Sequence, residues 1–417
     1  MDEGASRRAA WIDTSLLSDP AGVSSMYHDP LRVLVVAPTP FFGDRGCHVR
    51  IYEEVRGLMA RGIETHLVTY PTGRSPEGLV ITRARAWFGI EAGMLGPTWG
   101  RPFLDLALLR VCWKAVREFK PHIVHGHLHE GIVIGALLRA RYGIPFVADL
   151  QGSLAGELAE HRFISGDGML HDLTSGVERW LVRRPDRLVT SSSHGAKLLA
   201  RQGVDGDRIA PLPDGVDVDV FRPGPPDAQL TSQLGLDGKR IVVFLGVLTD
   251  YQGVDLLLDA VPTVIRRRPD AHFLIMGYPN ETHYRNAAAA RGIERAVTFT
   301  GRVPYEQAPR WLNLGVVAVS PKRSLTEANG KLLNYMACGR PVVASDTPVN
   351  REVLGPAGLY AAVGDADALA QHLLEVLSDP KDARARGATL RVRAEEVFAW
   401  PVLLERLETL YRAILAS

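Results

Sequence analysis

The sequence predicts an α/β fold made of two domains, each built on a parallel sheet. Two observations favour this class: short apolar runs alternate with amphipathic stretches, and the alternation restarts after a proline- and glycine-rich segment at residues 211–227. The length of 417 residues also suits two domains of about 200 residues each better than one core. Open sheets of this class bind ligands at the carboxyl ends of their strands, so we expect a ligand in a cleft between the halves.

The elements of the first half follow the order of a parallel sheet. The run LRVLVVAP at its start is β-rich and predicts a buried strand, and the stripe Val49, Tyr52, Val55, Leu58 and Met59 predicts an amphipathic helix. The expected order is a strand at 31–38, a glycine-bearing loop at 39–46, a helix at 47–62, and strands at 63–70, 121–127, 144–153 and 185–193, with further helices at 131–143 and near 196–202.

The second half repeats the alternation. Strands are expected at 239–248, 271–277, 296–303, 316–321, 341–345 and 359–365, and helices at 253–269, 283–292, 305–315, 332–337, from residue 366, and at 400–415. Together the patterns divide the chain into an amino-terminal tail at 1–30, a first domain at 31–223, a second domain at 224–398, and a final helix at 399–417 that is expected to return to the first domain.

Composition narrows the class of protein. Lys and Arg total 48 against 47 for Asp and Glu, which gives no electrostatic case for nucleic acid. Cys47, Cys112 and Cys338 lie far apart and form no C-x-x-C pair, so a disulfide framework or a zinc site is not expected and a reducing cytoplasm fits. No run reaches signal-peptide or membrane-spanning length, while peripheral contact with a membrane stays open.

Three glycine-bearing loops follow predicted strands and suit an anionic ligand. They contain Gly43 and Gly46, then Gly246 to Gly253, and finally Gly330, which precedes Lys331 at a helix start. Backbone N–H groups at a helix start carry partial positive charge, and glycine lets a phosphate approach closely. Glu327 suits hydroxyl groups better than phosphate. Ordinary turns and a solvated first-turn lysine remain the alternative for each loop taken alone.

Two motifs give the chain a family resemblance. PDGVDVDVFRP is similar to the linker N-G-V-D-x-x-x-F-x-P, and NYMACGRPVVAS is similar to E-A-M-A-x-G-x-P-V-V-A-S; VTFTGRV and IVHGH agree as well. From about residue 31 to the end, the chain resembles the retaining glycosyltransferases of family 4, which have the GT-B fold of two Rossmann-like domains. The loop PTPFFGDRGCHVRIYEE looks like an uncharacterised branch of that family.

The resemblance implies a hexosyltransferase whose second domain holds a sugar nucleotide and whose first domain holds the acceptor. It implies that His127 contacts the transferred sugar and that Glu327 binds the sugar hydroxyls. The donor nucleotide sugar is a co-substrate, and no cofactor is implied. Donor-binding candidates are Gly43, Gly46, Gly246, Gln252, Arg302, Val303, Lys322, Gly330, Lys331, Leu332 and Asn334.

Within that set, the resemblance implies separate roles. The helix start at Gly330, Lys331 and Leu332 takes the diphosphate, Asn334 stands at the ribose, and residues 302–303 flank the base. The nucleotide, the sugar and the oligomeric state are not implied, and the acceptor can be a small molecule, a glycan or a lipid.

The chain departs from the family pattern around the diphosphate. Glu327 and Asn334 are one residue closer than the family's two glutamates, and the second position is an amide, which carries no charge. Val247 and Gln252 stand where the family tends to have arginine and lysine. Because charge-assisted contacts to phosphate are about twice as strong as neutral ones, Lys331 and Lys322 are the expected replacements.

The expected mechanism uses no metal. For retention without a nearby nucleophile, the acceptor attacks the sugar on the face that the phosphate leaves, and the departing phosphate takes the acceptor's proton. No D-x-D motif is placed to bridge a diphosphate through a metal ion. His125, His127 and His129 alternate along IVHGHLHEG, which predicts one face of a strand end. A zinc site there is disfavoured because no cysteine or carboxylate set accompanies them, and a core histidine is the default for one of the three.

Acceptor contacts are predicted at other strand ends of the first domain. The candidates are His129, Asp149, Gln151, Gly152, Ser153 and Trp99, the last in a segment that can equally be irregular core. Two other functions stay open. One is a sugar-nucleotide epimerase of the same fold, for which no acid and base carboxylates are identified. The other is a non-catalytic sugar-nucleotide-binding partner, motivated by Val247, Gln252 and Asn334.

Overall fold

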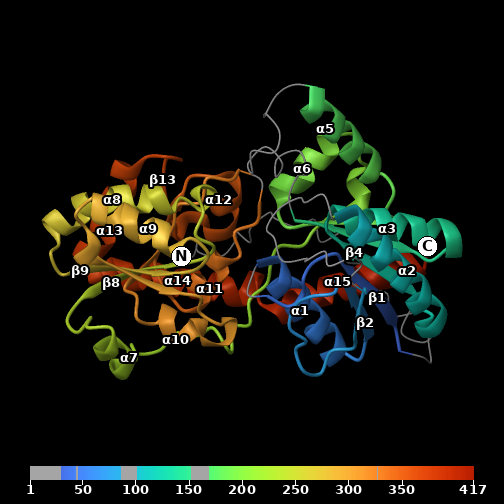
Figure 1. Ribbon diagram of the computed structural model, residues 1–417, viewed down its shortest axis with the longest axis horizontal. Helices are drawn as coiled ribbons and strands as arrows, with labels where there is room; N and C mark the ends of the chain where they lie inside the picture. The colour runs from blue at the N-terminus through green and yellow to red at the C-terminus, as the bar shows by residue number, and fades with distance from the viewer. Residues whose placement is uncertain (1–29, 44–45, 86–100, 152–168, 326) are drawn as a thin grey trace, which may run out of the picture.

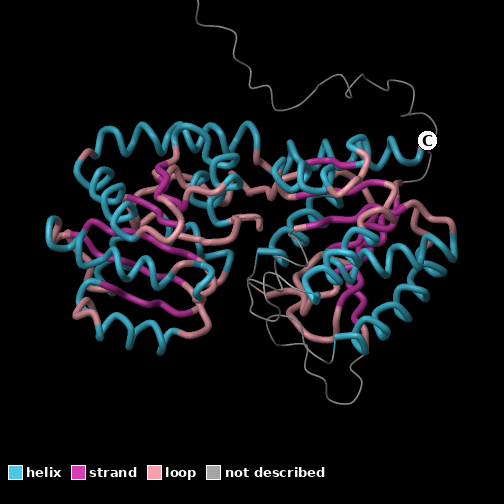
Figure 2. The backbone as a smooth tube through the Cα atoms, turned by 90° about the horizontal axis from the view of Figure 1, so that it is seen from above, coloured by secondary structure: helices cyan, strands magenta, loops and turns pink. Residues whose placement is uncertain are grey.

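The computed structural model describes residues 30–43, 46–85, 101–151, 169–325 and 327–417, with only the backbone for 169–173. The chain forms two α/β domains, the carboxyl-terminal one on the left of Figure 1 and the amino-terminal one on the right. Seen from above in Figure 2, the strands of each domain lie between layers of helices. The predicted class, two parallel sheets with interleaved helices, is confirmed.

The amino-terminal sheet has seven parallel strands in the order β3-β2-β1-β4-β5-β6-β7. Alternate residues of β1 belong to different core clusters, Val33 and Val35 to one and Leu34 and Val36 to the other, so both faces of the sheet are covered. The strands are β1 (Arg32–Ala37), β2 (Glu64–Thr69), β3 (Ile81–Arg83), β4 (Ile123–His127), β5 (Phe146–Leu150), β6 (Arg187–Thr190) and β7 (Ile209–Pro211).

Helices cover the two faces of this sheet unequally. One face packs against α2 (Arg101–Phe119), α3 (Leu128–Tyr142), α5 (Met169–Leu181) and α6 (Ser193–Arg201), and the other packs against α1 (Gly46–Ala60) and a helix from the chain's end. A short 3-10 helix, Gly206–Arg208, precedes β7. The Ser192 side chain accepts from the backbone N–H of Gly195, which caps the start of α6.

The carboxyl-terminal sheet has six parallel strands in the order β10-β9-β8-β11-β12-β13. The strands are β8 (Arg240–Leu245), β9 (Ala271–Met276), β10 (Val297–Gly301), β11 (Val317–Ser320), β12 (Val342–Ser345) and β13 (Leu359–Ala361). Its first face packs against α8 (Val254–Arg267), α9 (Glu281–Ala290) and α13 (Ala366–Ser378). Its second face packs against α7 (Ala228–Gln233), α10 (Ala308–Leu312), α11 (Lys331–Ala337), α12 (Pro348–Leu354) and α14 (Pro380–Val397).

The last helix, α15 (Trp400–Leu415), leaves the second domain and packs on the first beside α1 (Figure 1). The two helices approach closely, because a Cβ built at Gly57 of α1 would lie 2.1 Å from Leu404 Cδ1 of α15. The chain passes between the domains twice, and backbone hydrogen bonds join the two segments: Val216 N–H donates to Phe398 O, and Trp400 N–H donates to Val216 O. The chain's last segment therefore completes the core of its first domain.

Three expectations about elements are corrected. His129 does not continue the strand, because β4 ends at His127 and the chain turns into α3 through Leu128, whose φ of 61° lies in the left-handed region. The helix expected at 305–315 is shorter, Ala308–Leu312, preceded by a 3-10 turn at Tyr305–Gln307. The long helix α14 was not expected, because its small and charged residues show almost no apolar periodicity.

Candidate functional site

Lys331 lies at the start of α11 in the second domain. Its Nζ donates to the Gln252 side-chain oxygen and lies 4.5 Å from the centroid of the Phe244 ring. Gly246 follows β8 with a φ of 156°, and a Cβ there would lie 2.7 Å from Lys331 Nζ. Glycine at 246 therefore leaves the space in which the ammonium sits. Lys331 of α11 thus reaches the loop after β8, although the two are far apart in the sequence.

A second lysine lies close to the first. Lys322 is 4% exposed, and its Nζ lies 2.7 Å from Glu327 Oε2 and donates to Ala328 O at 2.7 Å. Burial lowers the pKa of Lys331 well below its ordinary value of 10.5, and the charge of Lys322 lowers it further. Two ammonium groups whose charges act on each other form a site that an anion would stabilise. This is the electrostatic character that the sequence predicted for the segment around Gly330.

The first domain contains a buried polar cluster under its strand ends. It consists of Arg50 and Glu54 of α1, His125 and His127 of β4, Asp149 of β5, and Tyr411 of α15, and each of these residues is at most 2% exposed. Arg50 Nε donates to Asp149 Oδ2 at 2.7 Å, and Tyr411 Oη lies 2.6 Å from His125 Nδ1. The Arg50 guanidinium stabilises the charged carboxylate of Asp149, so the pKa of Asp149 is well below its usual range although the side chain is buried.

Asp214 connects this cluster to the second domain. Arg50 Nη1 donates to Asp214 Oδ1 at 2.9 Å, and Arg50 Nη2 donates to Leu212 O at 3.1 Å. A Cβ built at Gly330 would lie 3.1 Å from Asp214 Oδ2, so this carboxylate lies directly beside the residue before α11. Burial raises the pKa of Asp214, although Arg50 opposes that shift. The linker carboxylate therefore stands between the two candidate sites.

A second contact joins the domains at α6. The Glu352 carboxylate of α12 accepts from Ser193 N–H at 2.7 Å and from His194 N–H at 3.3 Å. A carboxylate at a helix start complements the partial positive charge of the free backbone N–H groups. This contact adds to the Arg50–Asp214 pair in setting how the two domains lie.

Several predicted site residues occupy unexpected surroundings. His127 was expected to face a cleft, but its ring is 0% exposed and lies 3.8 Å from Glu54 Oε1 and 3.3 Å from Asp149 Oδ2. Asp149 was expected to meet an acceptor, but it is also fully buried and is bound by Arg50. His129, on α3, lies 3.8 Å from Glu178 Oε1 and apart from the stacked pair of His125 and His127. Sugar contact by His127 stays a prediction, and it requires the covering groups to move.

The remaining candidates lie mostly at strand ends, as expected. Gly43 N–H donates to His48 Nδ1, and Gly46 begins α1. Arg302 and Val303 follow β10, with the Arg302 guanidinium 5.4 Å from the Tyr278 ring centroid. Leu332 is core, whereas Asn334 and Gln151 are half-buried. Gly152, Ser153 and Trp99 lie outside the described residues.

Arg50, Glu54 and Asp214 were missed by the sequence analysis. The stripe predicted for α1 assumed that charged residues point to solvent, yet Arg50 and Glu54 are buried beside Ile51 and Val55. One signal was present: Arg50 and Glu54 are one helical turn apart and flank an apolar residue of the sheet-facing side. Their partners are on β4, β5 and the linker, so no local pattern could identify them.

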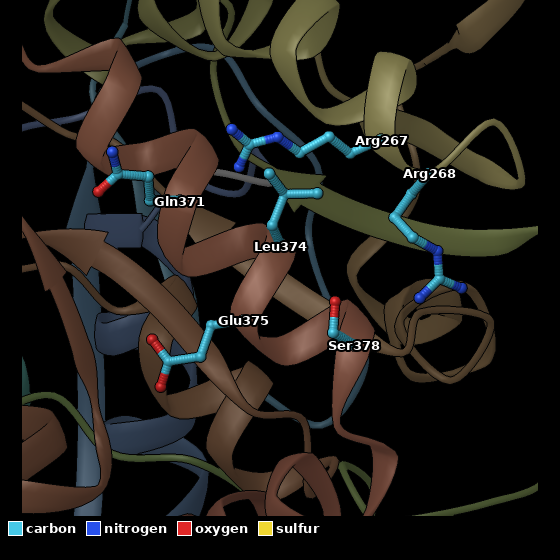
Figure 3. A pocket seen from close by; sticks show the side chains of 6 residues that line it. All are labelled: Arg267, Arg268, Gln371, Leu374, Glu375 and Ser378. Carbon is cyan, nitrogen blue, oxygen red and sulfur yellow. The ribbon is translucent and has the colours of Figure 1, made fainter.

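A hollow of ≈ 390 Å³ lies elsewhere on the second domain, lined by Arg267, Arg268, Gln371, Leu374, Glu375 and Ser378 (Figure 3). It lies where α8 ends and before β9 begins, at the amino end of that strand. Ligands of open α/β sheets bind at the opposite, carboxyl end. Its Arg268 is already bound to Asp270 and to Leu377 O. We therefore place the candidate site at the two lysines.

Two family models match the chain, one in each domain. Residues 45–215 match a Glycosyl transferase 4-like domain, and residues 239–379 match Glycosyl transferases group 1. The chain is 28% identical to D-inositol 3-phosphate glycosyltransferase of Gordonia bronchialis over 406 residues, which cover 91% of this chain and 86% of the relative. It is 32% identical over 213 residues to the GDP-mannose-dependent monoacylated alpha-(1-6)-phosphatidylinositol monomannoside mannosyltransferase of Corynebacterium glutamicum, covering 48% and 55%.

Solved structures share the fold. Sucrose-phosphate synthase from Thermosynechococcus elongatus superposes with a TM-score of 0.76 at 18% identity, covering 93% of this chain and 99% of that one. HepE of Anabaena, in complex with UDP and glucose, gives a TM-score of 0.74 at 16% identity, covering 91% and 99%. At these identities the likeness concerns the arrangement of the two domains.

Proposed function

Because this chain belongs to glycosyltransferase family 4, has the GT-B fold and transfers a sugar from a nucleotide donor, we propose that the transfer retains the anomeric configuration. The donor diphosphate lies against the second domain, with its phosphates at Lys331 and Lys322. The acceptor approaches from the first domain. The nucleotide diphosphate leaves as the second product.

The observation that carries this proposal is Lys331 beside Gly246, with the charge of Lys322 acting on it. As the bond from the sugar C1 to the diphosphate lengthens, negative charge grows on the leaving oxygen, and preorganised cations stabilise that charge. Gln252, at a position where the family tends to have lysine, accepts from Lys331 Nζ. Lys331 thus places its ammonium beside the position where the family tends to have lysine. Lys322, paired with Glu327, supplies the second charge.

In the proposed mechanism the acceptor oxygen attacks C1 on the face that the diphosphate leaves. The C1–O bond to the phosphate breaks as the new glycosidic bond forms, and a phosphate oxygen takes the acceptor's proton. Glu327 binds sugar hydroxyls through the carboxylate that Lys322 holds in place. No divalent ion on the diphosphate takes part, because the two lysines supply the charge.

A hydroxyl-bearing small molecule, a glycan or a lipid can serve as the acceptor. Phe103, Leu106 and Trp113 of α2 are 55%, 40% and 38% exposed and recur at helical spacing, which favours contact with a lipid-bearing acceptor at a membrane surface. Within the described residues, none of the helices is long and apolar enough to cross a bilayer. Peripheral membrane contact and a cytoplasmic location are parts of this proposal.

The function is tested with sugar nucleotides and the full chain. We expect one of the UDP-, GDP- or ADP-sugars to raise the melting temperature, because a ligand at 100 times its Kd stabilises the native state by about 2.7 kcal/mol. The stabilising donor should then release nucleoside diphosphate only when acceptor is present, and NMR of the product should show the donor's anomeric configuration. Conversion of the sugar without acceptor would indicate an epimerase, and binding without turnover of any acceptor would indicate a non-catalytic protein.

Donor binding is also expected to take up protons. Lys331 has a lowered pKa in the free protein, and a diphosphate beside its ammonium would raise that pKa again. The protonated lysine binds the donor better, so donor affinity should fall as pH rises from the pKa of the free protein towards that of the complex. Calorimetry at pH 8 in two buffers of different ionisation enthalpy measures the uptake. The same uptake in Lys331→Met would contradict this assignment.

A further inference from the structure

Seven of the twelve exposed large apolar side chains among the described residues lie on three neighbouring helices of the first domain. The helices α2, α3 and α5 lie side by side on one face of the sheet, with α3 in the middle (Figure 1). Their buried apolar residues belong to one core cluster, so their exposed residues point away from the same core. The seven are Phe103, Leu106, Trp113, Val133, Leu137, Val177 and Trp180. Exposed apolar residues gathered in this way mark a site of interaction.

On each helix the apolar residues form a stripe that ends in arginine. Alternate spacings of three and four residues line up one side of α2, which consists of Phe103, Leu106, Arg110, Trp113 and Arg117. A spacing of four residues joins Val133, Leu137 and Arg141 on α3. At the end of α5, the Arg184 guanidinium lies 4.0 Å from the centroid of the Trp180 ring. The three stripes therefore share one layout, with apolar side chains first and a cation after them.

The charged residues of this face are almost all cations. Among the described side chains from α2, α3 and α5 to the turn after α5, the exposed carboxylate is Glu118, and the exposed cations are Arg110, Lys114, Arg117, Arg139, Arg141, Arg179, Arg183 and Arg184. Lys114 lies 3.7 Å from Glu118, and Arg139 lies 2.5 Å from Asp186. The whole chain has 48 Lys and Arg against 47 Asp and Glu, so positive charge is concentrated on this face.

A hollow of ≈ 460 Å³ lies beside Trp180 on this face. It is lined by Gly176, Arg179, Trp180, Arg183 and Arg184. The three arginines have no carboxylate partner among the described residues, and Arg183 Nη2 donates to Gln202 O at 3.1 Å. A guanidinium has five N–H donors, so each of the three keeps donors for a further acceptor. Several guanidinium groups around one hollow suit a phosphate.

The combination of apolar and cationic side chains favours an anionic bilayer over other partners. Tryptophan rings and the aliphatic stems of arginine pack well at the interface of a bilayer, where guanidinium groups reach the lipid phosphates. A second copy of this chain would place arginine against arginine across a symmetric contact. Nucleic acid is bound mainly through its phosphates, which would leave the seven apolar side chains exposed.

We propose that the exposed face of α2, α3 and α5 docks the first domain on an anionic phospholipid bilayer, with a lipid phosphate in the hollow beside Trp180. This docking deepens the membrane contact of the proposed function and rests on that function for its lipid acceptor. Tyr70, which follows β2, donates from its Oη to Asp105 of α2 at 2.5 Å. The stripe on α2 therefore begins at the carboxyl ends of the strands, where ligands of this fold bind, so a lipid acceptor reaches the site from the bilayer.

Vesicle flotation with the full chain tests the docking. We expect binding to phosphatidylcholine vesicles that contain about 30% phosphatidylglycerol, and at least tenfold weaker binding to phosphatidylcholine alone, because each Lys or Arg near an anionic surface strengthens binding by about fivefold. Binding to the anionic vesicles should weaken when the ionic strength rises from about 0.1 M to about 1 M, because salt screens exposed charges.

Two variants separate the cations from the apolar side chains. Arg117→Gln/Arg141→Gln/Arg184→Gln should weaken binding to anionic vesicles by about 100-fold, since three cations are lost at about fivefold each. Trp113→Ser/Trp180→Ser should weaken the same binding by about tenfold or more, since both rings leave the interface. Circular dichroism checks the fold of both variants. Their thermal shift with the donor should equal that of the wild type, because the donor is placed on the second domain.

The matched controls lie on the second domain. Arg266→Gln/Arg295→Gln/Arg384→Gln removes the same charge from exposed positions, and Val363→Ser/Val392→Ser removes exposed apolar side chains. Both controls should bind anionic vesicles as the wild type does. A loss as large as that of the first-domain variants would mean that net charge or general surface character explains the binding, and the proposed face would be wrong.

Hydroxyl-radical footprinting of the wild type gives a readout that needs no variant. Anionic vesicles should protect Trp113 and Trp180 from oxidation and leave Val392 of the second domain accessible. If a variant does not fold, this footprint and the comparison of vesicles decide. Absence of binding to anionic vesicles would overturn the proposal, as would equal binding to neutral vesicles, equal binding by both first-domain variants, or unprotected tryptophans.

Self-association is the outcome that would assign this face to another partner. A dimer in analytical ultracentrifugation that Trp113→Ser/Trp180→Ser abolishes, together with no vesicle binding, would make the face an interface between two copies of the chain and overturn the docking. None of these measurements requires a sugar donor or an acceptor. Failure of the proposed transfer would therefore leave the vesicle test intact, and failure of the docking would leave donor binding to be judged separately.

Discussion

Lys331→Ala is expected to lower kcat/KM for the donor by about 100-fold while leaving the protein folded. Removal of one preorganised group that stabilises transition-state charge typically costs two to three orders of magnitude in rate. The fold should survive because Lys331 is half-buried and its ammonium bonds only Gln252 and the face of Phe244 among the contacts of this site. Steady-state kinetics with the donor identified by thermal shift measure the effect, and circular dichroism checks the fold.

The matched control for this variant is Lys239→Ala. Lys239 is exposed on the same domain, and its Nζ donates to Pro269 O, away from the loop after β8. Its kinetics should equal those of the wild type. If Lys331→Ala had unchanged kinetics, Lys331 would be removed from the site and the proposed position of the diphosphate would be wrong. A rise in KM with kcat unchanged would mean that the lysine binds donor and transition state equally.

Arg50→Met is expected to destabilise the first domain by about 3–5 kcal/mol. Removing one partner of a buried ion pair leaves the others charged and unpaired. Arg50 is 2% exposed and binds Asp149, Asp214 and Leu212 O, so three acceptors lose their donor at once. Methionine keeps most of the volume, which separates loss of charge from loss of packing. The midpoint of urea denaturation, followed by circular dichroism, measures the change.

An exposed ion pair supplies the control for Arg50. Arg351 pairs with Asp346 on the surface of the second domain, with 57% of its side chain exposed. Exposed pairs contribute little because water screens them, so Arg351→Met should leave the midpoint almost unchanged. Equal midpoints for Arg50→Met and Arg351→Met would show that the buried network does not hold the domain together.

Most strands and helices could be expected from the sequence because their signals are local. Residues 33–37 and 241–245 are continuous apolar runs, as strands buried on both faces must be, and both lie in central strands. The edge strands β3 and β7 were not expected, because Ile-Thr-Arg and Ile-Ala-Pro do not form apolar runs of the kind that marks β13. For α14, packing against α11 and α13 of the second domain overrides a weak pattern.

At the candidate site, too, some residues could be expected from local signals and others depend on tertiary contacts. Gly246, Lys322 and Lys331 were expected from loops and charges. The structure places Lys331 beside Gly246, and the charge of Lys322 acts on Lys331. That Gln252 would accept from Lys331 was not expected, because the two lie on different elements. His127 and Asp149 were found at the right strand ends, yet their exposure was expected wrongly, since burial depends on α1 and α15 packing over them.

The sequence alone determined the two parallel sheets, the linker between them and the cationic character of the segment around Gly330. Periodicity, turn residues and charge are properties of neighbouring residues, so they can be read without the fold. Only the tertiary structure decided that Glu54 meets His125 and His127, and that Arg50 joins Asp149 to Asp214. Those contacts connect a helix, two strands and the linker, and the free energy that favours them exists only once the two domains have packed.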